Sequence, residues 1–286
     1  MQTSSNEGGK NPTREMPEDR QKNECEIIDF PRSRTIIVDT LEEGKKMHLA
    51  FGWGEVDVTV ALQLIQAVKD QTGESLSFTA FVLYCMSKAL DEFKPVQAVR
   101  KGKKLYIYDE IDISTMVERE NSAGHKVLTT VIVRRANKKS FKELNDEIRA
   151  AQQCELNGVA LGSSKEAKQT NMFSRLPKFL RSAIWRKVRG NPEFRKKTLG
   201  TAMLTSVGMF APGGGFALTH SPWPVEVIVG GIVRRPAYEE GDIIAPHNFL
   251  CLTIGIDHGI VDGAPATRFA TKLVKNLEAG LGLPEV

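Results

Sequence analysis

The residues whose types and spacing could do chemistry lie near the C-terminus, in the stretch "LTIGIDHGIVDG". An alternating apolar run, which predicts a buried strand, ends there at His258, and Asp262 follows shortly after it. A neutral imidazole with a pKa near neutrality suits a general base, provided that a second group holds its ring. The spacing leaves two interpretations open: His258 is a catalytic base presented at the end of a strand, or it is an ordinary exposed or hydrogen-bonded histidine.

Cysteine chemistry is not expected from this sequence. The four cysteines are far apart, form no CxxC pair and sit mostly in apolar runs: Cys25, Cys85, Cys154 and Cys251. Such spacing predicts reduced thiols in a cytosolic protein. We therefore predict neither a disulfide nor a metal site.

Composition bounds the class of protein. The 286 residues are 41% hydrophobic and 26% charged, which is typical of a globular chain. A net charge of +4 is too mild to indicate a nucleic-acid partner. The N-terminus lacks the apolar stretch of a secretory signal, and no apolar run approaches the roughly 20 residues that span a bilayer. We expect a soluble, cytoplasmic protein.

The elements that must position His258 alternate between helix and strand. Residues 1–25 are polar and rich in Gly and Pro, which predicts a disordered tail, and residues 26–286 are predicted to form the folded domain. A strand is expected around residues 50–60. Helical spacing follows in "VTVALQLIQAVKDQTG", with Thr59 as N-cap and Gly73 just past the end.

The rest of the chain continues this mixture. A second helix, at residues 77–93, is apolar on most faces and is predicted to lie in the core. Amphipathic helices are expected at residues 138–153 and 264–280. Runs rich in Val, Ile, Thr and Tyr predict strands at residues 103–118, 125–136, 200–210, 226–237 and 249–257. The expected fold class is α+β, a mixed sheet with flanking helices.

Two segments interrupt this scheme. A basic stretch at about residues 172–198 spaces its apolar residues as an amphipathic helix with a cationic face. It is either a solvated helix packed on the core or, over residues 175–189, a peripheral contact with a membrane surface or an anionic ligand. The second segment, "APGGGFALTHSPWP", lacks the Lys-Ser/Thr of a phosphate-binding P-loop.

The stretch "DHGIVDG" matches the H-x-x-x-D-G signature of a known acyltransferase superfamily. With the ordered blocks around it, the chain resembles the catalytic domain of 2-oxo acid dehydrogenase E2 components (dihydrolipoyl acyltransferases), relatives of chloramphenicol acetyltransferase. The resemblance covers roughly residues 30–280, except for the basic insertion. The blocks that carry it are "SFTAFVLYCMSKALDEFKPVQAV", "YDEIDISTMVE", "VLTTVIVRRANKKSFKELNDEIR" and "GTAMLTSVGMF".

The resemblance implies a chloramphenicol acetyltransferase-like two-layer sandwich with its active site between the subunits of a homotrimer. His258 would be the general base, and Asp262 would brace the turn, which Gly263 allows to be tight. Thr205, with Ser206 beside it, would donate a hydrogen bond to the oxyanion from the next subunit. The substrates implied are acyl-CoA and an acceptor, possibly dihydrolipoamide on another chain, with no lipoyl group attached to this chain and no metal.

The sequence also departs from the E2 pattern. Residues 1–30 match neither a lipoyl domain nor a subunit-binding domain, the arginine that usually follows the histidine is Gly259, and the apolar C-terminal tail is replaced by "GLGLPEV". Three hypotheses remain: a stand-alone CoA-dependent acyltransferase, an E2 subunit that uses a lipoyl domain supplied by another chain, and a catalytically silent trimeric scaffold or membrane-associated interaction protein.

Overall fold

The computed structural model describes most of the chain. The described residues are 25–31, 34–120, 126–153, 173, 175–208 and 213–284. The disordered tail predicted for residues 1–25 lies outside this part of the chain, apart from Cys25, and so does Cys154.

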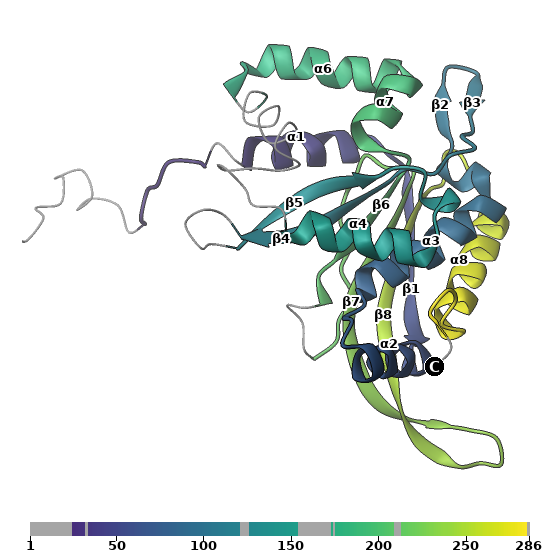
Figure 1. Ribbon diagram of the computed structural model, residues 1–286. Helices are drawn as coiled ribbons and strands as arrows, with labels where there is room; N and C mark the ends of the chain where they lie inside the picture. The colour runs from purple at the N-terminus through teal and green to yellow at the C-terminus, as the bar shows by residue number, and fades with distance from the viewer. Residues whose placement is uncertain are drawn as a thin grey trace, which may run out of the picture.

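The centre of the fold is a six-stranded mixed sheet with the strand order β1-β8-β7-β6-β4-β5 (Figure 1). β6 runs parallel to both of its neighbours, and the other pairs are antiparallel. The strands are β1 (Leu49–Asp57), β4 (Ile113–Glu120), β5 (Lys126–Val133), β6 (Ala202–Ser206), β7 (Val225–Tyr238) and β8 (Ile244–Asp257). The predicted mixture of strands and helices in one α+β unit is confirmed.

Four helices cover one face of this sheet (Figure 1). They are α2 (Thr59–Thr72), α3 (Phe78–Glu92), α4 (Phe141–Gln153) and α8 (Gly263–Glu278). The helix α3 lies in the core as predicted, with Phe81, Leu83 and Met86 fully buried. Alternate residues of the central strands, including Val227 and Ile254, point at these helices, which explains the apolar pattern of the strands.

The ends of α2 and α3 follow from local hydrogen bonds. The helix α2 ends where Gly73 adopts a φ of 74°, as predicted. Its start differs from the prediction: Thr59 is the first helical residue, and its backbone N–H donates to the Asp57 carboxylate at 2.9 Å. In α3 the Ser77 hydroxyl accepts from the backbone N–H of Ala80.

The strand predicted at residues 103–118 is divided in two. A short hairpin of β2 (Val99–Lys101) and β3 (Lys104–Tyr106) stands apart from the main sheet. A non-strand segment separates β3 from β4, because the backbone of Asp112 hydrogen-bonds to Thr201 before β4 begins. Two short 3₁₀ turns, η3 (Lys94–Gln97) and η4 (Ala136–Lys138), complete this region.

The basic insertion forms two helices instead of the one predicted. They are α6 (Lys178–Gly190) and α7 (Pro192–Leu199). The helical conformation is interrupted between them because Asn191 is the N-cap of α7. Its side chain accepts a hydrogen bond from the backbone N–H of Phe194 at 3.0 Å, and Pro192 is the first residue of that helix.

The helix α6 packs against α1 (Thr35–Gly44) and the body of the protein. Arg181 pairs with Asp39 at 2.6 Å, Arg189 pairs with Glu43, and Trp185 and Val188 of α6 are buried. Part of its cationic face therefore holds the helix in place. This favours the core-packed interpretation for these residues.

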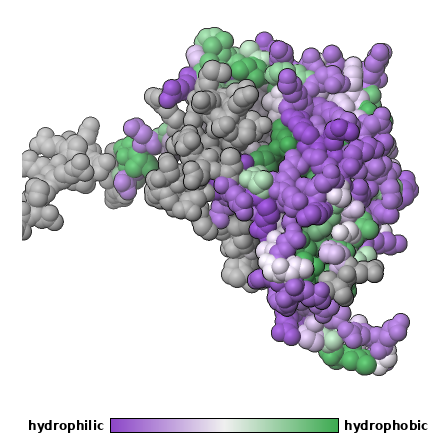
Figure 2. Space-filling model, viewed as in Figure 1, coloured by the Kyte–Doolittle hydropathy of each residue, from purple (hydrophilic) through white to green (hydrophobic). Residues whose placement is uncertain are grey.

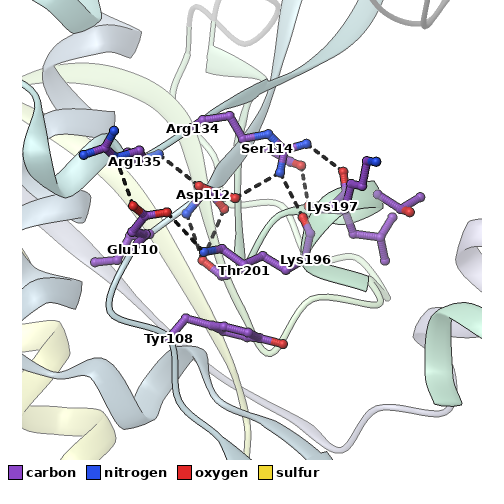
Figure 3. A network of polar contacts seen from close by, with 12 residues as sticks. Tyr108, Glu110, Asp112, Ser114, Arg134, Arg135, Lys196, Lys197 and Thr201 are labelled. Atoms are coloured by element: carbon purple, nitrogen blue, oxygen red, sulfur yellow. Dashed lines mark hydrogen bonds and ion pairs between the residues drawn. The ribbon is translucent and has the colours of Figure 1, made fainter. Parts of the chain in front are cut away.

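A polar network fixes the end of α7 to the sheet (Figure 3). Arg134 donates to the Asp112 carboxylate at 2.9 Å and to the Lys196 and Lys197 carbonyls at 2.9 and 2.6 Å. The backbone N–H of Thr201 donates to the Asp112 carbonyl at 2.6 Å. Since Asp112 is almost fully buried, this network holds α7 rigidly against the start of β4 and β6.

The β7–β8 pair extends as a ribbon beyond the body of the molecule (Figure 1). Its tip carries the exposed apolar side chains of Tyr238, Ile243 and Ile244, seen as a hydrophobic end in Figure 2. Phe179 and Leu180 are exposed on α6. Among the described residues, no helix is long and apolar enough to cross a membrane.

Candidate active site

His258 stands on a turn directly after β8, and its side chain is exposed. Its backbone N–H donates to the carbonyl of His48 at 2.9 Å. The Asp257 carboxylate accepts from the backbone N–H of Gly259 at 3.0 Å, and its carbonyl accepts from Ile260 at 3.0 Å. The backbone that carries His258 is thus held on both sides.

The imidazole of His258 makes no hydrogen bond to any other residue that the structure describes. It projects from a fixed backbone into open space, so a ring nitrogen is available to a substrate. This arrangement is what a general base needs before its substrate binds.

Asp262 does not brace the turn within one chain. It occupies the N-cap of α8 and is exposed, and its carbonyl accepts from Ala266 at 3.2 Å. Its carboxylate contacts no hydrogen-bond donor among the described residues, and Asp257 holds the turn in its place. Gly263 is the first residue of α8, where a Cβ would meet no atom within 4 Å, so a tight turn does not require glycine there.

Thr205 lies in β6 on the sheet face opposite the core helices, and it is partly exposed. Its hydroxyl points at the Met116 sulfur, 3.8 Å away, which is only a weak acceptor. The hydroxyl can therefore donate to a stronger acceptor. Ser206 follows it and points to the other face.

A single chain does not bring Thr205 and His258 together. The register aligns Thr205 with Ile228 of β7, and Ile228 with Thr253 of β8. His258 lies five positions beyond Thr253, about 16 Å along the strand at the usual rise, and two strand spacings add roughly 10 Å sideways. The two groups can meet only if they come from different copies of the chain.

The structure shows a cavity beside the His258 turn that sequence reasoning missed. It has a volume of about 180 Å³ and lies between the insertion, α1, β2 and the end of β8. Trp185, Arg195 and Arg100 line it together with Asp257. An open depression of about 290 Å³, lined by His48, Gly259 and the same Arg100 and Asp257, adjoins it. The cluster of basic residues in the insertion was the one sequence signal for this site.

Another histidine has a structural role. The ring of His247 lies between the carboxylates of Asp57 and Glu239, the second at 3.0 Å. Hydrogen bonds to Asp57 and then to Glu239 raise the pKa of His247 above its ordinary value. This cluster ties β8 to the start of α2. Within the described residues, no group of His, Cys, Asp and Glu side chains could hold a metal ion.

A comparison with known families matches most of the chain. The family model described as "2-oxoacid dehydrogenases acyltransferase (catalytic domain)" matches residues 22–160 and 186–283. The unmatched residues between these ranges include the first half of α6. The predicted family resemblance is therefore confirmed, whereas the unmatched residues coincide only in part with the insertion predicted at about residues 172–198.

Curated relatives are named as acyltransferase components of dehydrogenase complexes. The lipoamide acyltransferase component of the branched-chain alpha-keto acid dehydrogenase complex of Bacillus subtilis is 23% identical over 240 residues, covering 82% of this chain and 48% of the relative. The dihydrolipoyllysine-residue succinyltransferase component of the 2-oxoglutarate dehydrogenase complex of Saccharomyces cerevisiae is 25% identical, covering 87% and 47%. The chain spans about half the length of these relatives.

Solved structures share the fold. A probable dihydrolipoamide acetyltransferase from Listeria monocytogenes superposes with a TM-score of 0.66 at 24% identity, covering 92% of this chain and 98% of that chain. The cubic core of the pyruvate dehydrogenase multienzyme complex gives a TM-score of 0.62 at 17% identity, covering 94% and 97%. These values show that this sheet with its flanking helices is the fold of such catalytic domains.

Proposed function

Because the chain belongs to the 2-oxoacid dehydrogenase acyltransferase family, we propose that it transfers an acyl group between a CoA thioester and an acceptor, with His258 as general base. A ring nitrogen of His258 takes the proton from the attacking thiol, hydroxyl or amine. The acceptor atom then adds to the thioester carbonyl, and the tetrahedral intermediate collapses with release of the CoA thiolate, which takes up a proton.

Thr205 of a neighbouring subunit is the proposed donor to the oxyanion of that intermediate. Its hydroxyl faces only the Met116 sulfur within its own chain and so is free to turn toward a stronger acceptor. Removing one such donor lowers the rate by about 100- to 1000-fold in enzymes where this has been measured. The site then belongs to a homotrimer in which each His258 meets the Thr205 of the next copy.

The observation that carries this proposal is the presentation of His258. The turn is fixed by Asp257 and by the carbonyl of His48, yet the imidazole itself is exposed. A fixed backbone with a free ring supports a chemical role better than a structural one, since a structural histidine is held by its ring, as His247 is.

The test is release of free thiol from acetyl-CoA and longer acyl-CoAs in the presence of a panel of acceptors. We expect thiol release by the wild-type protein and a loss of at least about 100-fold in His258→Ala, the lower end for a missing general base. No release above background by either protein would support the catalytically silent scaffold instead, and equal release above background would rule out His258 as the general base.

A dihydrolipoyl group carried by another chain is a second candidate acceptor. It is favoured by the relatives, whose names describe acyl transfer to dihydrolipoyllysine residues. Free dihydrolipoamide in the acceptor panel separates the two hypotheses. Acylation of dihydrolipoamide faster than of all other acceptors would favour an E2 subunit acting with a lipoyl domain.

A further inference from the structure

The cavity beside the His258 turn is built partly by the segment that the family model does not match. Trp185, in α6, is the last residue of the unmatched stretch, and it lines the cavity together with Arg195 of α7. Arg100 of β2 and Asp257 and Ile260 of the His258 turn also line it. We call this cavity the insertion pocket. It connects α6 and α7 to the backbone that carries His258.

Positive charge dominates the insertion pocket. Four cationic side chains and two carboxylates line it: Lys46, Arg100, Arg189 and Arg195, with Glu43 and Asp257. Glu43 pairs with Arg189 and with Lys46. Burial alone would raise the pKa of Glu43, but these hydrogen bonds outweigh it and hold the pKa below its ordinary value. Glu43 is therefore ionised and engaged with those two cations.

The two remaining arginines have no such partner. Neither Arg100 nor Arg195 forms an ion pair with a carboxylate of the described residues. Arg195 is only 7% exposed, and its guanidinium donates to the carbonyl of Pro222. Burial lowers the pKa of Arg195, and the nearby charges of Asp257 and Glu43 offset only part of this cost of holding the guanidinium away from water. An anion in the pocket would offset that cost.

Trp185 supplies a second, independent sign of a ligand. Its indole is 8% exposed, and the Nε1 atom is buried without a hydrogen-bond partner among the described residues. An indole N–H can only donate, so an unpaired one inside a protein costs free energy. Because the Nε1 atom has almost no accessible surface, an acceptor oxygen bound in the pocket satisfies it only if the indole turns toward the cavity.

We propose that the insertion pocket binds a carboxylate or phosphate group of the acyl acceptor, held by Arg195 and Arg100 and by the Trp185 indole. The volume of about 180 Å³ is sufficient for one such group. The Asp112 network keeps α7, and with it Arg195, in a fixed position (Figure 3). This inference rests on the proposed function and adds a class of acceptor to it.

Binding of the anion can be measured without turnover. Inorganic phosphate and acetate are titrated into the full chain by calorimetry, and the rise in Tm with each anion is recorded. Trp185→Phe keeps the ring and removes the donor, so we expect phosphate or acetate affinity to fall by about tenfold. Arg186→Gln is the matched control, because it removes a charge from an exposed position of α6 outside the pocket.

Arg195→Met separates a binding role from a structural one. Methionine fills a volume similar to that of arginine and removes the cost of burying the charge. We therefore expect Arg195→Met to keep or raise the Tm of the free protein while losing the rise in Tm caused by the anion. A lower Tm with undiminished anion binding would overturn the proposal.

Kinetics connect the pocket to the acceptor. Arg100→Gln should raise the KM for an acceptor that carries a carboxylate or phosphate and leave the KM for acetyl-CoA unchanged. A rise in the KM for acetyl-CoA alone, or the absence of any anion binding, would overturn the proposal. Anion binding with no acyl transfer to any acceptor would instead contradict the proposed function and leave the pocket as a binding site.

Discussion

The two acids that flank His258 differ in what their carboxylates contact. Asp257 accepts from the backbone of Gly259 and also lines the insertion pocket, whereas Asp262 is exposed and contacts no donor among the described residues of its own chain. We therefore assign the positioning of His258 within a subunit to Asp257. A role for Asp262 in bracing the turn stays a prediction that requires a neighbouring subunit.

Glu226 is the other acid with an unusual environment. It lies in β7 opposite Gly255, its side chain and that of Phe51 both cover this glycine, and it is fully buried. Neither carboxylate oxygen has a hydrogen-bond partner among the described residues. Burial raises the pKa of Glu226 from 4.5 to about 7, and the neighbouring Ser221 hydroxyl offsets only part of this.

Glu226 should make the folded protein less stable as the pH rises, whereas most carboxyl groups in folded proteins have the opposite effect. Because its folded-state pKa lies above the unfolded value of 4.5, the folded state binds more protons between pH 4.5 and about 7. Stability is thus expected to fall by up to about 3 kcal/mol as pH rises through this range. In urea unfolding, Glu226→Gln should remove that fall, and the exposed Glu240→Gln should retain it. Parallel pH profiles for Glu226→Gln and the wild type would contradict this assignment.

At the scale of elements, the insertion depends on a close contact between α1 and the loop before β7. A Cβ at Gly44, in the last turn of α1, would lie 2.6 Å from the backbone of His220. This approach brings Glu43 and Lys46 to the insertion pocket. The helix α6 then packs on α1 through Arg181, so the two helices form one wall.

Gly44→Ala should therefore destabilise the protein, because two backbones would have to separate. We expect a loss of about 1–3 kcal/mol in the free energy of unfolding, typical of overpacking. Gly190→Ala is the matched control: a Cβ there meets no atom within 4 Å, and alanine favours the helix, so a gain of about 0.5 kcal/mol is expected. Equal effects of the two substitutions on chemical denaturation would rule out the close contact.

At the scale of the whole molecule, the two proposed catalytic groups lie far apart on the same sheet, one in β6 and the other just after β8. Thr205 and His258 are separated by two strand spacings and by five positions along β8. The ribbon of β7 and β8 and the start of α6 both expose apolar side chains that a second copy could cover. These features support the homotrimer that the family resemblance implies.

A site shared between subunits predicts complementation. His258→Ala and Thr205→Val chains, each nearly inactive alone, should regain about one quarter of wild-type activity when co-expressed in equal amounts, because that fraction of interfaces combines two intact groups. Light scattering should give three times the chain mass of 31.7 kDa for the mixture. A trimeric mixture with no more activity than either variant would show that the two groups do not share a site.

Local pattern accounts for what could be predicted about the elements. Apolar spacing predicted four helices: α2, α3, α4 and α8. Gly73 predicted the end of α2 because glycine, unlike residues with a side chain, adopts a positive φ without strain. The start of α2 and the break at Asn191 were misjudged. Their caps depend on which of several neighbouring polar groups meets a free backbone N–H, and local sequence does not decide this.

The sequence by itself determined the family and singled out His258 as the candidate base, because a short motif and blocks in a fixed order can be recognised in the linear sequence. Only the tertiary structure decided that Asp257 holds the turn, that Glu226 is buried without a partner, and that Arg195 and Trp185 meet at a cavity. Each of these depends on segments far apart in the sequence. Burial and charge pairing arise from the packing of such segments, and no local pattern encodes them.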